Sequence, residues 1–143
     1  MNRIRSTLLL VLLVSLASSQ SCLDINGNPV TWWAKLIYPG SVPGGFGYFD
    51  STFSAPSFVQ YQQGADSTGT PLYNTLNQIN TMNLQTTAWN DEMPNGTTSS
   101  TKAHSKGVLA YNQQSMLGFF LCHSIPQYPA FIGFNINITI NSS

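Results

Sequence analysis

A histidine and a lysine two positions apart, His104 and Lys106, are the residues of this 143-residue sequence best suited to chemistry. If the stretch from Lys106 to Tyr111 is a β-strand, side chains two positions apart project from the same face of that strand. An imidazole can attack phosphorus, and a neighbouring ammonium can hold the non-bridging oxygens as charge builds up on them. The pair is therefore suited to an attack on a phosphate ester.

A second strand is predicted from Gly118 to His123. The link from Asn112 to Leu117 has the length of a hairpin connection, so the two strands are expected to be antiparallel neighbours. The second strand should contribute three residues to the core: Phe119, Phe120 and Leu121. Together the two strands must position both histidines of the sequence.

The segment containing both strands, AHSKGVLAYNQQSMLGFFLCHSIPQYP at 103–129, resembles the first-half active-site segment of the deoxyribonuclease II family. The family pattern is His-Thr/Ser-Lys-Gly, an apolar run, an aspartate, and then Gly-Phe-Trp-Leu-x-His-Ser-x-Pro-x-Phe/Tyr-Pro. One position departs from it, because Asn112 stands where the family often has aspartate. The resemblance covers nearly all of residues 22–131 and corresponds to the first half of a family member.

This resemblance implies an α+β fold with a mostly antiparallel mixed β-sheet flanked by helices, one half of a two-half phospholipase D-like architecture. It also implies an acid endodeoxyribonuclease that needs no metal or other cofactor. His104 would attack a DNA phosphodiester to form a phosphohistidine, and Lys106 would hold the phosphoryl oxygens. The second His-x-Lys motif, which would protonate the leaving oxygen, is absent from this sequence. It would come from a missing C-terminal half or from a second copy of the chain.

Two further residues are expected to support this site. Asn112 could still accept a hydrogen bond in place of the family's carboxylate. His123 has three open roles: a metal ligand together with His104, a second catalytic group, or a hydrogen-bonded histidine that positions the first strand. Two histidines without a third ligand are a weak zinc signal. We favour the positioning role for His123, because the motif assigns the nucleophile to His104.

Residues 1–19 are typical of a signal peptide, with Arg3 and Arg5 before the apolar run Leu8–Ala17. That run is too short for a membrane span. Residues 20–143 would then form one domain with three lysines and five acidic residues, hence a net charge of −2 with neutral histidines. Composition alone does not indicate a nucleic-acid binder, since such proteins are usually basic. An acidic, lysosome-like or extracellular location reached through the secretory pathway would soften this objection, because histidines would gain charge.

A secreted chain can form disulfides and carry glycans. The simplest pairing is a Cys22–Cys122 bridge, whereas the family resemblance implies that Cys22 pairs with a cysteine beyond this segment. Both alternatives stay open on the sequence. Three Asn-x-Ser/Thr sequons predict N-glycosylation: Asn95, Asn137 and Asn141.

The remaining pattern predicts elements rather than chemistry. A strand is expected from Val30 to Ile37, with two core tryptophans, Trp32 and Trp33. A helix should begin with Thr70 as its cap and Pro71 at its first position. One apolar stripe follows at helical spacing: Leu72, Leu76, Ile79 and Met82.

Two adjacent acids, Asp91 and Glu92, follow a strand predicted from Leu84. Neighbouring residues in a turn are expected to point apart, and no histidine or third acid is near in sequence, so the pair does not predict a metal site. Of the other charged groups, Lys35 is expected to be solvated and Asp50 to serve a turn.

Two functions from different classes remain open on the sequence. The first is the acid endodeoxyribonuclease, or its first half, acting on DNA. The second is a catalytically inactive, secreted and glycosylated binding or structural domain that retains the fold. Cleavage of DNA at acid pH without metal, abolished by loss of His104, would distinguish them.

Overall fold

The computed structural model describes residues 20–38, 45–94, 96 and 105–140, and these residues form an α+β fold. The described part holds one helix, α1 (Pro71–Thr81), and ten strands. The strands are β1 (Cys22–Leu23), β2 (Pro29–Val30), β3 (Trp33–Ile37), β4 (Phe46–Asp50), β5 (Val59–Tyr61), β6 (Gln85–Asn90), β7 (Lys106–Asn112), β8 (Leu117–His123), β9 (Ala130–Ile132) and β10 (Asn135–Asn137). Every pairing between them is antiparallel, as expected from the sequence.

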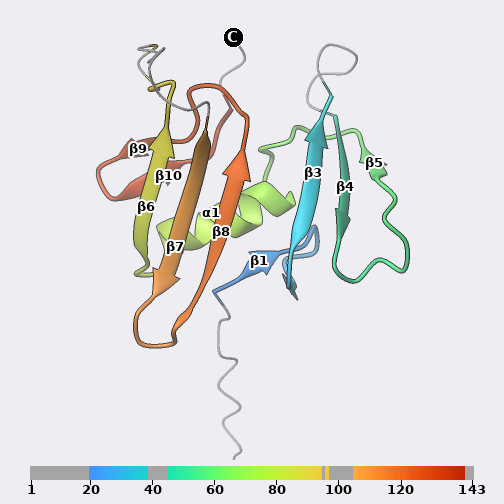
Figure 1. Cartoon of the computed structure of the whole chain (residues 1–143), viewed down its shortest axis with the longest axis horizontal. Coiled ribbons are helices and arrows are strands. Elements are labelled where there is room, and N and C mark those ends of the chain that lie inside the picture. Colours follow the sequence, from blue (N-terminus) through green and yellow to red (C-terminus); the bar gives the residue numbers. More distant parts are fainter. Residues whose placement is uncertain (1–19, 39–44, 95, 97–104, 141–143) are drawn as a thin grey trace, which may run out of the picture.

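The strands form two three-stranded sheets and two small ribbons, rather than one continuous sheet. The sheets have the orders β3-β4-β5 and β6-β7-β8, and the ribbons are β1-β2 and β9-β10. Figure 1 shows the two sheets side by side, with β8 and β3 as the strands that face each other across the middle. One half of a phospholipase D-like architecture remains a prediction for this arrangement.

The hairpin predicted around the motif is present. β7 and β8 pair from Lys106↔His123 to Asn112↔Leu117, and the side chain of Asn112 accepts hydrogen bonds from the backbone N–H groups of Gln114 and Ser115. An Asn at this position stabilises a tight turn because its side chain bonds to backbone two and three residues ahead. The turn thereby sets the register that places Lys106 opposite His123.

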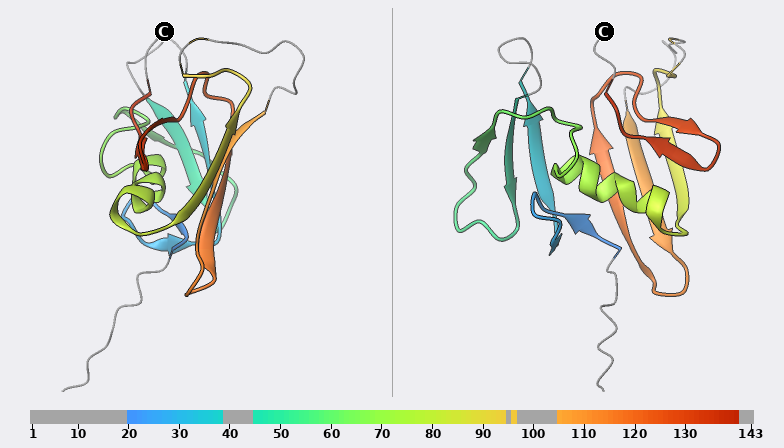
Figure 2. Two further views of the ribbon diagram at one scale, coloured as in Figure 1. Left: turned by 90° about the vertical axis from the view of Figure 1, so that its left-hand side faces the viewer. Right: turned by 180° about the vertical axis from the view of Figure 1, so that it is seen from behind.

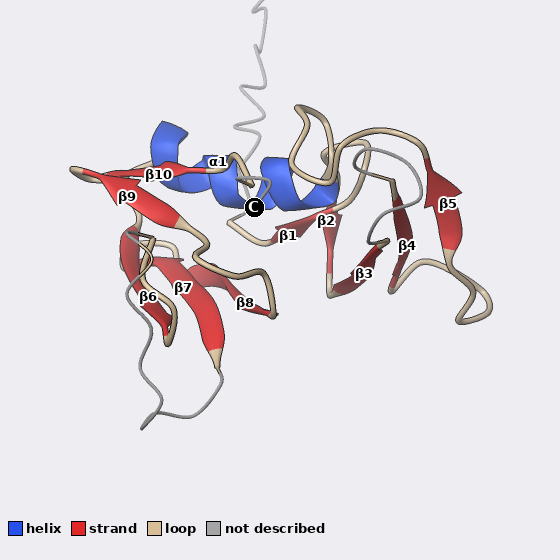
Figure 3. Cartoon of the chain, turned by 90° about the horizontal axis from the view of Figure 1, so that it is seen from above, coloured by secondary structure: helices blue, strands red, loops and turns tan. Residues whose placement is uncertain are grey.

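The helix also begins where the sequence predicts. The Thr70 side chain accepts a hydrogen bond from the backbone N–H of Tyr73, and Pro71 occupies the first turn. Three members of the predicted stripe are buried (Leu72, Leu76 and Ile79), whereas Met82 lies just past the helix end and is half-buried. Figures 2 and 3 show α1 lying along one side of both sheets.

Two hydrophobic clusters form the core. The first lies between α1 and the inner face of the β6–β8 sheet, and the second lies behind β3–β5 around Phe46 and Tyr48. Successive side chains of a strand point to opposite faces of the sheet, so every second residue faces the core. Val108, Phe119 and Leu121 therefore belong to the first cluster. Trp33 touches both clusters, and its indole N–H donates to the Thr75 hydroxyl on α1.

Three expectations about burial and extent are wrong. Phe120 is 58% exposed, because it lies between two inward-facing residues of β8 and therefore points outward. Trp32 is 46% exposed, because the predicted strand from Val30 to Ile37 is broken at Thr31 and Trp32. There the backbone of Thr31 and Trp32 bonds to Ser51 instead of continuing a ladder.

Candidate active site

Three neighbouring strands bring Asn90, Lys106 and His123 into one row at the end of the β6–β8 sheet. Asn90 on β6 is paired with Lys106 on β7, which is paired with His123 on β8. Residues directly opposite each other in antiparallel strands project from the same face. The row therefore faces the same side of the sheet as the core residues Val108 and Leu121.

The Lys106 ammonium is buried and neutralised by two carboxylates. The residue is 1% exposed, and its Nζ lies 2.6 Å from Asp91 Oδ1 and 3.3 Å from Glu92 Oε2. A lysine buried this completely is stable as a cation only when it is paired. The two acids that follow β6 therefore form part of the same cluster as the lysine that begins β7.

The turn after β6 is built to bring both acids to this lysine. The Asn90 side-chain oxygen accepts a hydrogen bond from the Glu92 backbone N–H, and its amide nitrogen donates to the Tyr128 carbonyl. The expectation that Asp91 and Glu92 point apart is wrong, because this side-chain-to-backbone turn lets both carboxylates reach one Nζ.

Electrostatics keep Lys106 charged. Burial alone would lower the pKa of its ammonium, but hydrogen bonds and charge–charge attraction from Asp91 and Glu92 outweigh burial and raise the pKa above its usual value. The lysine is thus a permanent cation across the acidic and neutral range. In this structure the ammonium is paired with the two acids and is not exposed to solvent.

His123 is the neutral member of the cluster. Its Nδ1 accepts a hydrogen bond from the Ile125 backbone N–H, so the ring proton resides on Nε2 when the ring is uncharged. Burial, followed by the nearby Lys106 charge, lowers the pKa of His123 to about 4. The ring packs edge-on against Tyr128 at 5.5 Å between centroids. Within the described residues, Nε2 is buried and has no hydrogen-bond partner.

The other predicted site residues fall elsewhere. His104 and the sequons at Asn95 and Asn141 lie outside the described residues, as do residues 1–19. Asn112 ends β7 six residues from Lys106, roughly 20 Å away at the rise of an extended strand, so the structure does not bring it to this cluster. The sequon residue Asn137 lies in β10, half-buried, and its side-chain oxygen accepts a hydrogen bond from Thr139 N–H.

The remaining charged residues singled out in the sequence have local roles. Asp50 accepts hydrogen bonds from the Tyr48 hydroxyl and from Thr52, so its predicted turn role is confirmed. The expectation that Lys35 is solvated is wrong. Its Nζ donates to the Ala65 carbonyl and lies 3.9 Å above the Phe46 ring centroid, on the far sheet from Lys106.

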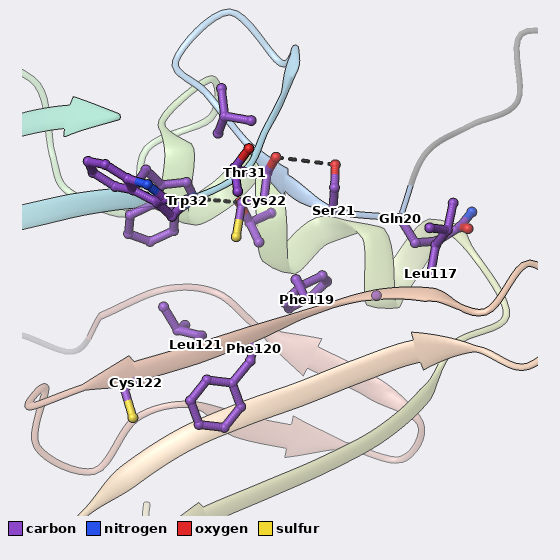
Figure 4. A pocket seen from close by; sticks show the side chains of 14 residues that line it. Gln20, Ser21, Cys22, Thr31, Trp32, Leu117, Phe119, Phe120, Leu121 and Cys122 are labelled. Atoms are coloured by element: carbon purple, nitrogen blue, oxygen red, sulfur yellow. Dashed lines mark hydrogen bonds between the residues drawn. The ribbon is translucent and has the colours of Figure 1, made fainter. Parts of the chain in front are cut away.

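A cavity of about 540 Å³ runs between the edge strand β8 and the start of β3 (Figure 4). Its walls are mainly apolar, with Trp32, Trp33 and Phe119 among them, and no lining residue is charged. A phosphate needs cationic or N–H partners, so this cavity does not suit one.

Both cysteines line this cavity, but the Cys22–Cys122 bridge does not form and both thiols are free. Cys122 alternates with the inward-facing residues of β8 and lies exposed on the outer face of the sheet. Cys22 packs against the core on the inner side. Figure 4 shows the two side chains apart and not facing each other. The simplest pairing predicted from the sequence is therefore wrong for this fold.

Sequence reasoning missed Asp91, Glu92 and Tyr128 as members of the site. One signal was available, because a strand ending at Asn90 beside a strand starting at Lys106 would place the following acids next to the lysine.

Residues 20–38, 45–94, 96 and 105–140 contain no cluster of three or more His, Cys, Asp or Glu side chains that could hold a metal ion. Over the same described ranges, no helix has both the length and the apolar character to cross a membrane.

Comparisons with known proteins give the family of this chain. The chain is 34% identical over 142 residues to cell death-related nuclease 6 of Caenorhabditis elegans, covering 89% of this chain and 36% of that protein. It is 30% identical to deoxyribonuclease-2-alpha of Rattus norvegicus, covering 87% and 39%. It is 29% identical to plancitoxin-1 of Acanthaster planci, covering 86% and 37%. The chain thus spans well under half the length of these relatives. The deoxyribonuclease II family model matches residues 21–142, and the chain belongs to the deoxyribonuclease II family.

Proposed function

We propose that this chain supplies the first-motif half of an acid endodeoxyribonuclease that hydrolyses DNA phosphodiesters without a metal ion or other cofactor. The observation that carries the proposal is the row of Asn90, Lys106 and His123, which places a permanent cation and a neutral imidazole side by side at the end of one sheet. Membership of the deoxyribonuclease II family supports DNA as the substrate.

The proposed reaction assigns one role to each residue of the motif. His104 attacks phosphorus with a ring nitrogen, the bond to the leaving oxygen breaks, and a phosphohistidine forms. Lys106 stabilises the negative charge on the non-bridging oxygens. A histidine from a second motif gives its proton to the leaving oxygen, and then takes a proton from the water that hydrolyses the phosphohistidine.

His123 serves as a positioning residue in this proposal. Its hydrogen bond to Ile125 and its pairing with Lys106 hold the end of β8 against the start of β7. The depressed pKa keeps the ring neutral over most of the acidic range. A neutral ring adds no second positive charge beside Lys106, so the lysine keeps its place.

The second motif is proposed to come from another polypeptide segment, either a further part of a longer protein or a second copy of this chain. The coverage of the relatives supports a further part, since the match takes up 36–39% of their lengths. We further propose that the protein enters the secretory pathway and works in a lysosome-like compartment or outside the cell. The leader-like residues 1–19 and the Asn95, Asn137 and Asn141 sequons support that route.

The test is plasmid nicking at about pH 5 in the presence of a chelator. Wild-type protein that includes the second motif, from a further segment or a second copy, is expected to nick DNA. His104→Ala is expected to abolish nicking, because the nucleophile is lost while the strand starting at Lys106 remains intact. The matched control is His123→Asn, which is expected to keep partial activity. Activity that disappears with chelator, or that survives His104→Ala, would contradict the proposal.

A second function is favoured by one observation, the enclosure of Lys106. An ammonium that is 1% exposed and paired with two acids cannot contact a phosphate in this conformation. The alternative is therefore a catalytically inactive, secreted binding or structural domain that retains the fold. It predicts no nicking at any pH, with sizing and nicking measured together on the same preparation to show that folded protein was assayed.

A further inference from the structure

The enclosure of Lys106 raises the question of how its charge reaches a substrate. Nζ has two carboxylate partners, at 2.6 Å from Asp91 and 3.3 Å from Glu92, and the lysine side chain is 1% exposed. The ammonium has a third N–H donor, but with the side chain enclosed a DNA phosphate can reach it only if part of that enclosure moves aside. The described structure therefore shows a closed form of the site.

The two carboxylates differ in how easily each can leave. Asp91 has a 7% exposed side chain and makes the shorter contact, whereas Glu92 has a 24% exposed side chain and makes the longer one. A charge left in water costs much less free energy than a charge left buried without a partner. The Glu92 oxygen that faces Lys106, Oε2, is buried and makes no hydrogen bond among the described residues, while the rest of the side chain is partly exposed. Asn90 bonds to the Glu92 backbone and leaves its side chain able to turn into solvent.

We propose that Asp91 is a positioning residue that holds Lys106 in the row, and that Glu92 is the group a DNA phosphodiester displaces from the lysine. This inference rests on the proposed function, because it assigns the substrate phosphate to the same lysine. It makes Glu92 the residue that sets how tightly the chain binds the DNA backbone. No covalent bond changes in the exchange; one anionic partner of Nζ replaces another.

Charge balance favours the exchange once Glu92 has left the lysine. With both acids ionised, the cluster of Lys106, Asp91 and Glu92 has a net charge of −1 and repels a phosphate. When the Glu92 carboxylate turns into solvent, the pair of Lys106 and Asp91 that remains is neutral. A phosphate approaching Nζ then meets no net negative charge.

The test measures binding and not cleavage. The probe is a phosphorothioate oligothymidylate, and its dissociation constant is measured calorimetrically at pH 7. Glu92→Gln is expected to bind about tenfold more tightly than wild type, the size of one charge-assisted contact.

Two matched variants separate the effect of freeing Lys106 from the effect of removing one negative charge. Asp24→Asn removes one negative charge away from the cluster and is expected to change affinity less than about twofold, as a distant screened charge should. Adding Lys106→Met to Glu92→Gln is expected to remove the gain. If Glu92→Gln does not fold, Glu92→Ala is compared with Glu92→Ala plus Lys106→Met, because the gain in affinity should again require the lysine.

Each outcome bears on one proposal. Unchanged affinity in Glu92→Gln, or a gain in affinity that persists without Lys106, would overturn the exchange. Binding with the expected dependence on Glu92 in a chain that never nicks DNA would support the exchange and count against the nuclease function alone.

Discussion

Lys106 illustrates how much a single residue can depend on its neighbours. The chemistry expected of it, holding a phosphate, requires a cation with a free donor, whereas the fold buries that cation between Asp91 and Glu92. Burial in itself opposes charge, so the two acids are what make a charged lysine compatible with the core. The same acids then limit access to it.

The pair between Lys106 and Asp91 makes a stability prediction. Lys106→Met is expected to lower the free energy of unfolding by about 3 kcal/mol, because it leaves Asp91 buried without its cation. The double variant with Asp91→Asn is expected to recover at least about half of that loss, since the only carboxylate that then lacks the lysine is the more exposed Glu92. Urea unfolding at pH 7 measures the free energy of unfolding of wild type, of each single variant and of the double variant. Strictly additive losses would mean that the pair is not coupled.

His123 makes a prediction about pH. Its folded pKa of about 4 lies below the unfolded value of 6.5, so its contribution to stability is complete above pH 6.5 and is lost as the pH falls toward 4. In His123→Asn the amide oxygen can take over the bond from Ile125, and no titration remains. Between pH 6.5 and 4, the free energy of unfolding of the variant should fall by about 1 kcal/mol less than that of wild type. This difference is smaller than the full pKa shift would give, because the ring is partly exposed and solvent screens its charge. Unfolding curves at pH 7, 5.5 and 4 measure this difference, and parallel losses would contradict it.

At the scale of elements, the β6–β8 sheet owes its geometry to alternation and to one glycine. Gly107 lies in the central strand on the outer face, and the Trp89 indole occupies the space above it. The indole stacks on Phe120 at 5.6 Å and donates to the Ser105 hydroxyl. The glycine next to Lys106 therefore serves packing, by letting a large ring cross the strand immediately before the site.

Gly107→Ala tests this packing. A Cβ there would overlap the Trp89 ring and lie 2.6 Å from the Leu121 carbonyl oxygen, so strand and ring must both shift. We expect a loss of about 2–3 kcal/mol in unfolding free energy, in the range of overpacked sites, together with a change in Trp89 fluorescence. The control is Leu109→Ala, the next outward position on β7, where the side chain is 41% exposed and the loss should stay within about 1 kcal/mol. Equal losses in both variants would argue against the clash.

At the scale of the whole molecule, two sheets share one helix and leave an apolar cavity between their facing edges. Edge strands carry unpaired backbone groups that invite another strand, and β8 and β3 are both edge strands here. The outer face of the β6–β8 sheet is also apolar, with Leu109, Tyr111 and Phe120 all at least 40% exposed. The molecule therefore has apolar surface both on the outer face of this sheet and in the cavity between the two sheets.

The free thiols make a prediction at this scale. Because Cys22 and Cys122 lie on opposite sides of the β8 strand, a reducing agent should leave the thermal midpoint unchanged within about 1 °C. Alkylation followed by mass spectrometry is expected to label exposed Cys122 first and Cys22 slowly, since burial raises the pKa of the Cys22 thiol. A midpoint that falls on reduction, or a chain that resists labelling until reduced, would contradict this arrangement.

Local sequence determined a substantial part of this protein. Thr70 and Pro71 define the helix start, the Asn112 turn defines the β7–β8 hairpin, and the alternation along both strands defines which residues share a face. These features depend on residues a few positions apart, so the chain carries them without reference to the rest of the fold. The motif around His104 and Lys106 likewise indicated the family that the comparisons then showed.

Only the tertiary structure decided what surrounds Lys106. The acids lie in a turn after β6, and their meeting with the lysine depends on strand pairing across fifteen residues of sequence. The exposure of Trp32 and the separation of the two thiols were decided in the same way, by a break in a strand and by the face of a sheet. Burial and electrostatics are properties of assembled surfaces, and no local pattern of residue types records which charges those surfaces will bring together.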